Sequence, residues 1–184
     1  AQAFDIAWDP KLLELAALGT VADVGPLRDE NRYLVKAGVD QLKQTQSPGL
    51  LALYRRARLN PSHIDAETIA FTLSPRLNAA GRMDHAATSL QLLITESESE
   101  AEDLAYKLEQ MNRQRQRLTR EFNEQALSLA EIRKNDPVII VESDDFTPGL
   151  VGLVASRLVD TFARPAIAIA FDGDLGRGSA RSIP

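Results

Sequence analysis

The feature that most constrains the fold is the stretch 96–134, where apolar side chains recur every three or four residues. This period predicts one amphipathic helix, about 58 Å long at ~1.5 Å per residue. Thr95 and Glu98 have capping-box spacing, which predicts where the helix starts. A helix of this length exceeds the radius of a small domain, so we expect it to span two bodies. A free coiled coil is the alternative, although Arg115 interrupts the apolar seam.

The segments on either side of this helix have different patterns. Residues 1–95 contain several short helical patterns joined by turns, and Pro75 is expected to end one of them. After residue 136, apolar strands at 138–141 and 166–171 flank a helix at 149–162. Strand, helix, strand in this order predicts a parallel pair with a right-handed crossover. The sequence therefore predicts an α/β protein.

Composition excludes several classes of protein. The 184 residues contain no cysteine, which excludes disulfides, thiol catalysis and Cys-ligated metals. His63 and His85 are interpreted as surface or packing residues, so a metal site would depend on carboxylates, which suit Mg²⁺ or Mn²⁺. No apolar run reaches the ~18 residues of a membrane span, and the first residues lack a secretory pattern. We therefore expect a cytoplasmic protein that does not cross a membrane.

Charge is distributed unevenly along the long helix. The net charge of −5 argues against bulk electrostatic binding to nucleic acid. Residues 96–110 contain six acidic side chains and one lysine, whereas 113–120 contain four arginines. This pattern indicates either a solvated helix whose acidic turns suit the helix dipole, or a local basic patch for nucleic acid.

Two segments combine small residues with groups that bind phosphate or metal. In segment 18–24, Asp23 either caps a turn or is paired or metal-bound, because burying an unpaired carboxylate is costly. In segment 74–82, Arg76 and Arg82 flank small residues that leave room for an anion. Guanidinium groups donate paired hydrogen bonds to phosphate, but these arginines could equally bridge acidic helices.

A third segment, 176–182, places glycines, serines and arginines after a strand, an arrangement that suits a phosphate cradle. Four motifs follow one another along the chain: ALGTVADVGPL (17–27), PRLNAAGRM (75–83), TPGLVGLVASRL (147–158) and GSARS (178–182). Together they resemble the RecJ-type single-stranded-DNA-specific exonucleases of the DHH phosphoesterase superfamily, from about Leu12 to Pro184. The long helix lies where that family joins its two catalytic domains.

This resemblance implies a domain organisation. Residues 1–95 correspond to the helical C-terminal part of a DHH phosphoesterase domain and 96–135 to the long connecting helix. Residues 136–184 correspond to the start of a βαβ-containing DHHA1 domain. The family's upstream aspartate motifs and DHH triplet are not in the sequence, so the chain is interpreted as an internal fragment. Thr147 stands where relatives commonly show histidine.

The resemblance also implies a function, namely part of a 5′→3′ exonuclease that hydrolyses phosphodiester bonds in DNA repair and recombination. The complete enzyme would use two Mn²⁺ or Mg²⁺ ions, and this chain alone would be inactive. Its partners would be single-stranded DNA, single-strand-binding protein and a helicase. Asp23 is the implied catalytic metal ligand. The implied phosphate or DNA contacts are Arg76, Asn78, Arg82, Ser179, Arg181 and Ser182.

Two other functions share part of this pattern. One is another DHH-family phosphodiesterase, acting on small oligonucleotides or cyclic dinucleotides. The other is a non-catalytic nucleic-acid-binding scaffold, which would tolerate Asp23 as a lone carboxylate. The long helix and the motif at 147–158 favour the RecJ-type interpretation over the first of these.

Overall fold

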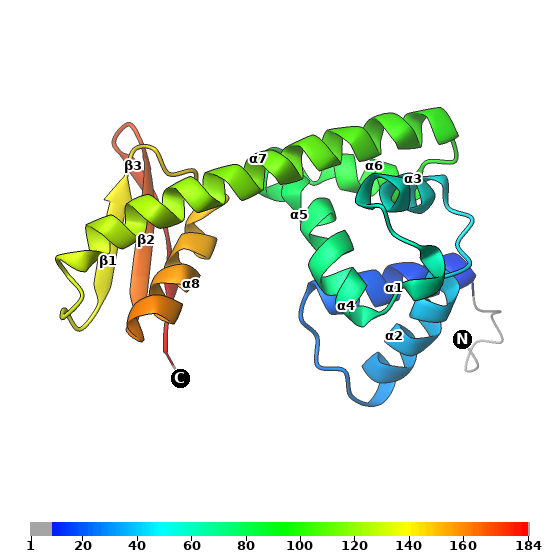
Figure 1. Ribbon diagram of the computed structural model, residues 1–184, viewed down its shortest axis with the longest axis horizontal. Coiled ribbons are helices and arrows are strands. Elements are labelled where there is room, and N and C mark those ends of the chain that lie inside the picture. Colours follow the sequence, from blue (N-terminus) through cyan, green and yellow to red (C-terminus); the bar gives the residue numbers. More distant parts are fainter. Residues whose placement is uncertain (1–8, 184) are drawn as a thin grey trace. The chain divides into compact units, whose positions relative to one another are not determined.

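The computed structural model describes residues 9–183. The chain divides into two compact units, 1–112 and 113–184, and the boundary lies inside one long helix, α7 (Glu98–Glu131). Figure 1 shows this helix continuing from the helical unit into the unit that carries the strands. The domain boundaries at residues 95 and 135 stay a prediction, whereas the order of short helices, long helix and strand–helix–strand is confirmed.

Unit 1, as far as it is described, is helical and surrounds one apolar core. Large apolar side chains such as Leu53, Ile69 and Leu92 are fully buried there, and each contributes ~1.5–3 kcal/mol relative to exposure. In residues 9–183 no helix combines the length and apolar content needed to cross a membrane. The elements of unit 1 before α7 are α1 (Pro10–Ala22), α2 (Asp29–Leu42), α3 (Pro48–Ala57), η2 (Pro61–His63), α4 (Ala66–Thr68), η3 (Ile69–Leu73), α5 (Ser74–Met83) and α6 (Ala87–Ile94).

Helices α1 and α2 cross at very short distance. Asp9 starts α1 by accepting a hydrogen bond from the Lys11 backbone N–H at 2.9 Å. At the crossing, a Cβ added to Gly38 would lie 2.2 Å from the carbonyl oxygen of Leu13 and 2.5 Å from Cβ of Ala17. The contact therefore requires glycine, because any side chain at this position would separate the two helices.

Pro75 does not end a helix, contrary to the prediction. The π-helical turn η3 continues directly into α5, and Pro75 lies in the first turn of α5, where a missing N–H is tolerated. The Ser74 N–H donates to the carbonyl of Ile69, and the Arg76 guanidinium donates to the carbonyl of Thr72 at 2.7 Å. These bonds satisfy the carbonyls of Ile69 and Thr72 in the π-turn, and α5 continues from this turn without a break.

The first turns of α7 are fixed by side-chain bonds. The Ser97 hydroxyl accepts the backbone N–H of Glu100 at 3.3 Å, and the Glu100 carboxylate accepts a hydrogen bond from the Thr95 hydroxyl. The predicted cap of Thr95 and Glu98 is therefore wrong by two residues, and Ser97 with Glu100 has the capping-box spacing instead.

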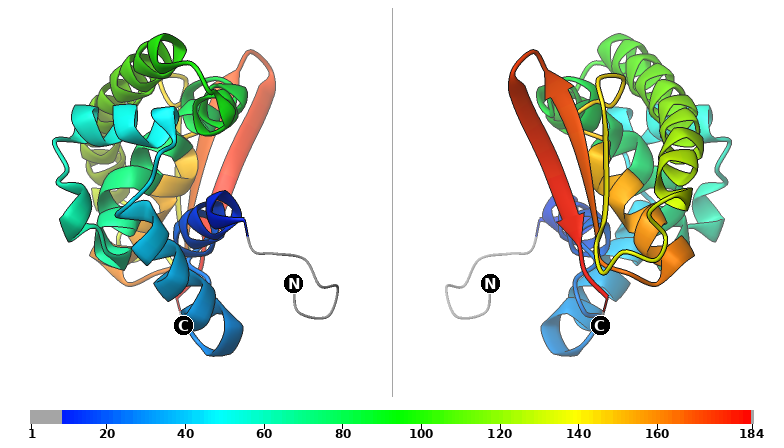
Figure 2. Two further views of the ribbon diagram at one scale, coloured as in Figure 1. Left: turned by 90° about the vertical axis from the view of Figure 1, so that its right-hand side faces the viewer. Right: turned by 90° about the vertical axis from the view of Figure 1, so that its left-hand side faces the viewer.

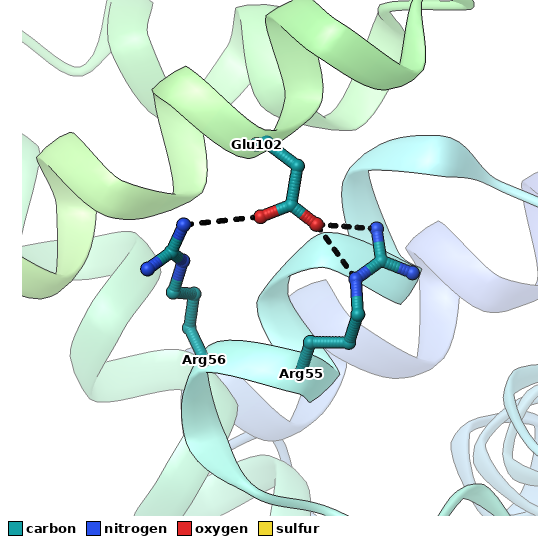
Figure 3. Close-up of polar contacts among 3 residues, drawn as sticks. All are labelled: Arg55, Arg56 and Glu102. Atoms are coloured by element: carbon teal, nitrogen blue, oxygen red, sulfur yellow. Dashed lines mark hydrogen bonds and ion pairs between the residues drawn. The ribbon is translucent and has the colours of Figure 1, made fainter.

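A carboxylate clamp then holds α7 to α3. Glu102 accepts hydrogen bonds from Arg55 at 2.6 Å and from Arg56 at 3.2 Å (Figure 3). Arg56 also lies over the Tyr106 ring, 5.4 Å from its centroid. The hydrogen bond from Arg55 is the main reason why the pKa of Glu102 is lowered. Glu102 therefore stays ionised and binds both arginines of α3.

Unit 2 combines the remainder of α7 with a small α/β sheet. Its elements are β1 (Ile139–Ser143), α8 (Val151–Phe162), β2 (Ala166–Asp172) and β3 (Leu175–Arg181). The strand order is β1-β2-β3, with β1 parallel to β2 and β3 antiparallel to it. The predicted βαβ unit is thus confirmed. Figure 2 shows β2 and β3 side by side, and α8 packs against both.

The core of unit 2 lies between this sheet and the helices. Phe122 of α7 contacts Phe146, with the ring centroids 5.3 Å apart. Leu158 of α8 and Ile139 of β1 are fully buried. Because Ala166, Ala168 and Ala170 alternate with less buried residues, they define the buried face of β2.

The crossing of α1 and α2 predicts a specific effect of Gly38→Ala. Overpacking against backbone should lower the free energy of unfolding by about 2–3 kcal/mol. The matched control is Gly19→Ala, because an added Cβ there meets nothing within 4 Å. That change should raise stability by up to ~1 kcal/mol through helix propensity. Urea unfolding measures both, and equal effects of the two substitutions would contradict the packing argument.

The clamp at Glu102 predicts a pH-dependent stability. Because its folded-state pKa is lowered, the ionised form stabilises the fold above the unfolded-state pKa. This stabilisation is lost as the pH falls through the folded-state pKa. Glu102→Gln should therefore cost about 0.5–1 kcal/mol at neutral pH and nothing in acid. Urea unfolding of both proteins between about pH 7 and about pH 3 measures the difference in unfolding free energy. A difference that stays the same at every pH would contradict a stabilising role of the ionised carboxylate.

Candidate functional site

Residues predicted from two distant motifs line one cavity in unit 1. The cavity has a volume of about 430 Å³ and is lined by Gly19, Ala22 and Asp23 at the end of α1 and by Asn78 and Arg82 of α5. The structure brings the two motifs together because α1 and α5 pack against each other. The predicted site residues Asp23, Asn78 and Arg82 therefore share one surface cavity.

The helical geometry of α5 explains which of its residues reach the cavity. Asn78 and Arg82 are four residues apart, so they lie on the same face one turn apart. Ala79 and Ala80 are fully buried and point into the core. Asn78 is exposed and Arg82 is half-buried. A side-chain amide and a guanidinium thus line the same wall of the cavity.

Asp23 lies at the C-terminal end of α1, where a carboxylate does not stabilise the helix. It is the C-cap residue of α1, and its own backbone N–H donates to the carbonyl of Gly19 at 3.0 Å. The helix C-terminus carries partial negative charge, which repels a carboxylate. Within the described residues, no hydrogen bond to the Asp23 side chain is found. The cap interpretation of Asp23 is therefore not supported by the geometry, and a cation beside it would relieve the repulsion.

One carboxylate does not fit a site for two divalent ions. In the part of the chain that the structure describes, no group of three or more His, Cys, Asp or Glu side chains is close enough to hold a metal. Mg²⁺ and Mn²⁺ prefer about six oxygen ligands. Both histidines are exposed, as predicted, and His85 lies 3.6 Å from Asp84. The residues present therefore supply one carboxylate ligand.

Arg76 is not among the residues that line the cavity. Its Nε atom donates to the Glu109 carboxylate of α7 at 2.8 Å, and both side chains are largely buried. The sequence left two interpretations of Arg76, a phosphate contact and a bridge to an acidic helix. In this structure Arg76 forms the bridge to an acidic helix. A phosphate contact by Arg76 stays a prediction.

The serine and arginine of GSARS form a second cluster, in unit 2. Ser179 pairs with Ala168 and Arg181 with Ala166 across β2 and β3, so both side chains lie on the buried face of the sheet. The Arg181 guanidinium donates to the Ser179 hydroxyl at 3.0 Å and to the Ala180 carbonyl at 2.8 Å. Arg181 remains exposed, so its other donors are accessible.

Gly152 of α8 lies next to this cluster, and sequence reasoning did not single it out. A Cβ at this position would lie 3.3 Å from Nη2 of Arg181 and 3.4 Å from Oγ of Ser179. The glycine lets α8 approach the cluster closely, and its only sequence signal is its place within the motif at 147–158. Ser182 lies beyond β3, and its hydroxyl donates to the carbonyl of Ile183. The Thr147 hydroxyl is buried without a hydrogen-bond partner among the described residues.

Comparison with known proteins gives the family. No family model matches the sequence. The chain is similar to the single-stranded-DNA-specific exonuclease RecJ of Bacillus subtilis (strain 168), with 42% identity over 176 residues, 94% of this chain and 22% of the relative. It is also similar to solved structures of RecJ from Thermus thermophilus. The complex with Mn²⁺ has a TM-score of 0.86 at 32% identity and covers 99% of this chain and 27% of that chain. The complex with Mg²⁺ has a TM-score of 0.87, also at 32% identity, and covers 99% of this chain and 28% of that one.

These likenesses confirm the predicted fold class, namely the helical part of a DHH-type domain, a long connecting helix and a DHHA1-like α/β unit. Within that class, the chain belongs to the RecJ family. The chain spans less than a third of the length of each of these relatives.

Proposed function

We propose that this chain is part of a metal-dependent exonuclease that degrades single-stranded DNA from its 5′ end. The observation that carries this proposal is the cavity where Asp23 meets Asn78 and Arg82. It combines one carboxylate with donors that suit a phosphate, which is the chemistry of phosphodiester hydrolysis. The names of the relatives support the substrate, since they are single-stranded-DNA-specific exonucleases.

Each residue of the cavity has a distinct role in this proposal. Arg82 binds the terminal phosphate through two parallel N–H donors, and Asn78 adds an amide donor on the same wall. Asp23 supplies one oxygen ligand to divalent metal. Two such ions, when bound in the complete protein, lower the pKa of water and stabilise charge on the phosphate. The other metal ligands belong to parts of the longer protein outside these 184 residues, so the chain alone is inactive.

The cluster in unit 2 offers a second set of phosphate donors. Arg181 is held by Ser179 in a fixed direction, which reduces the conformational entropy that binding would cost. The Ser179 hydroxyl can donate to a phosphate oxygen while it accepts from Arg181. We include Ser182 among the proposed DNA contacts on the strength of its motif alone. Arg76 is bonded to Glu109 and to the Thr72 carbonyl, so it is not proposed as a contact to the phosphate in the cavity.

The proposed cofactor is Mn²⁺ or Mg²⁺, supported by the two metal-bound RecJ structures. The proposed setting is DNA repair and recombination in the cytoplasm. Single-strand-binding protein and a helicase are the proposed partners, because a single-strand nuclease depends on other proteins to expose and present its substrate.

Arg82→Ala tests the phosphate role. The variant should lose the preference for a 5′-phosphorylated oligonucleotide over a 5′-hydroxyl one, because a charge-assisted hydrogen bond contributes ~1.5–3 kcal/mol, about tenfold or more in affinity. Fluorescence anisotropy with both oligonucleotides measures the ratio, and Arg181→Ala should act in the same direction. Arg32→Ala, an exposed arginine of α2, is the control. Equal losses on both oligonucleotides would make Arg82 a general backbone contact.

Asp23→Ala tests the metal role. In a protein of the relatives' length, the variant should abolish Mn²⁺-dependent release of nucleotides from a labelled 5′-phosphorylated strand while leaving strand binding largely intact. The 184-residue chain should show no release with or without the substitution. If the 184-residue chain releases nucleotides and its Asp23→Ala variant does not, the conclusion that this chain supplies only one metal ligand is contradicted.

A further inference from the structure

The structure assigns Arg76 a role that its motif does not suggest. We infer that Arg76 is a positioning residue, which fixes the rotation of α5 about its own axis and thereby directs Asn78 and Arg82 into the cavity. The inference rests on the proposed function, because it concerns the cavity where the phosphate is proposed to bind.

The argument starts from the directions of side chains around α5. Successive residues of an α-helix are rotated by ~100°, so Arg76 points about 160° away from Asn78 and about 120° away from Arg82. Arg76 therefore cannot face the same ligand as these two residues. What it faces instead is Glu109 of α7, on the side of α5 away from the cavity.

Two bonds hold the Arg76 guanidinium, and they go to different elements. Nε donates to the Glu109 carboxylate at 2.8 Å, and Nη1 donates to the carbonyl of Thr72 at 2.7 Å. The side chains of Arg76 and Glu109 are only 17% and 10% exposed, so solvent screens this pair poorly. A planar guanidinium can satisfy both acceptors at once, which a lysine ammonium at the same position cannot do in the same geometry.

The π-helical turn before α5 is the reason why this rotation needs fixing. A π-turn contains one residue more per hydrogen-bonded turn than an α-turn, so everything after it is rotated by ~100° relative to a continuous α-helix. If η3 (Ile69–Leu73) relaxed to α-helical bonding, Asn78 and Arg82 would turn away from the cavity. Arg76 opposes this by bonding the Thr72 carbonyl inside the π-turn and Glu109 outside it.

The apolar and backbone contacts of α5 constrain its rotation less, since Leu77 packs against the core without a directional bond. Ala79 and Ala80, which face the core, are too small to interlock with their neighbours. The Ser89 hydroxyl donates to the carbonyl of Leu77 at 2.6 Å, a bond to the backbone near the helix axis. The two bonds of Arg76 act at the end of a long side chain, far from the helix axis, and therefore resist rotation strongly.

The test compares Arg76→Gln with Arg76→Lys, Glu109→Gln and a matched control, Arg55→Gln, in the 184-residue chain. Arg55 also joins a helix of unit 1 to α7 through a glutamate, but it does not contact α5. Nitrogen-15 NMR of the Asn78 amide and the Arg82 Nε–H reports side-chain placement without ligand, and titration with inorganic phosphate reports binding. Urea unfolding of each variant reports stability.

Arg76→Gln and Glu109→Gln should shift both side-chain signals and weaken phosphate binding at least fivefold. Arg76→Lys, which keeps the charge and the fold, should shift them less. The double variant Arg76→Glu with Glu109→Arg should restore the signals in part, because it rebuilds the ion pair without the bond to Thr72. Arg55→Gln should lower stability and leave the signals unchanged.

Unchanged Asn78 and Arg82 signals in both Arg76→Gln and Arg76→Lys would overturn the inference, and so would equal shifts in Arg55→Gln. If the wild-type chain and the Arg82→Ala variant respond alike to phosphate, only the proposed function is rejected. In that case the ligand-free signals still decide whether Arg76 positions α5.

Discussion

The burial of one apolar stripe of α7 is the constraint on which both units depend. Ala105 and Leu108 complete the core of unit 1, and Phe122 and Ala126 complete that of unit 2. Most of the stability of a helix in a protein comes from such packing rather than from intrinsic propensity. Both cores include side chains of α7 that are fully or almost fully buried, so each unit depends on its part of this helix to exclude water from its apolar residues.

The same helix also carries the polar groups that organise the candidate site. Glu102 and Glu109 are seven residues apart, two turns of α7, and therefore lie on the same side of it. Glu102 binds the arginines of α3, whereas Glu109 binds Arg76 of α5. The acidic residues at 96–110 are thus not only a solvated face, since two of them hold neighbouring helices to α7. The arrangement of α5, and with it the wall of the cavity, depends on this acidic side.

The sequence predicts the long-range pattern of the fold well and its local backbone less well. The apolar period of α7 and the strand–helix–strand order of unit 2 are strong signals, because many residues contribute to each. Pro75 misleads because its position in a first helical turn depends on the preceding π-turn and on Arg76, which local pattern does not show. The motifs identify Asp23, Asn78 and Arg82. However, the sequence alone does not show that Arg76 faces away from them, because the direction of its side chain depends on the exact helical register after the π-turn.

The position of Asp23 is best understood as a compromise between stability and chemistry. A carboxylate at a helix C-terminus is repelled by the peptide dipoles, and a residue of opposite charge would stabilise α1 better. Arg82 lines the same cavity, and in the proposed function its positive charge would compete with a metal for the Asp23 carboxylate. In the proposed function, a phosphate bound to Arg82 would reduce that competition, because it would neutralise the charge of the guanidinium. Under the proposed function, anion and cation would therefore favour each other's binding in this cavity, and the position of Asp23 would be stabilised only when the site is filled.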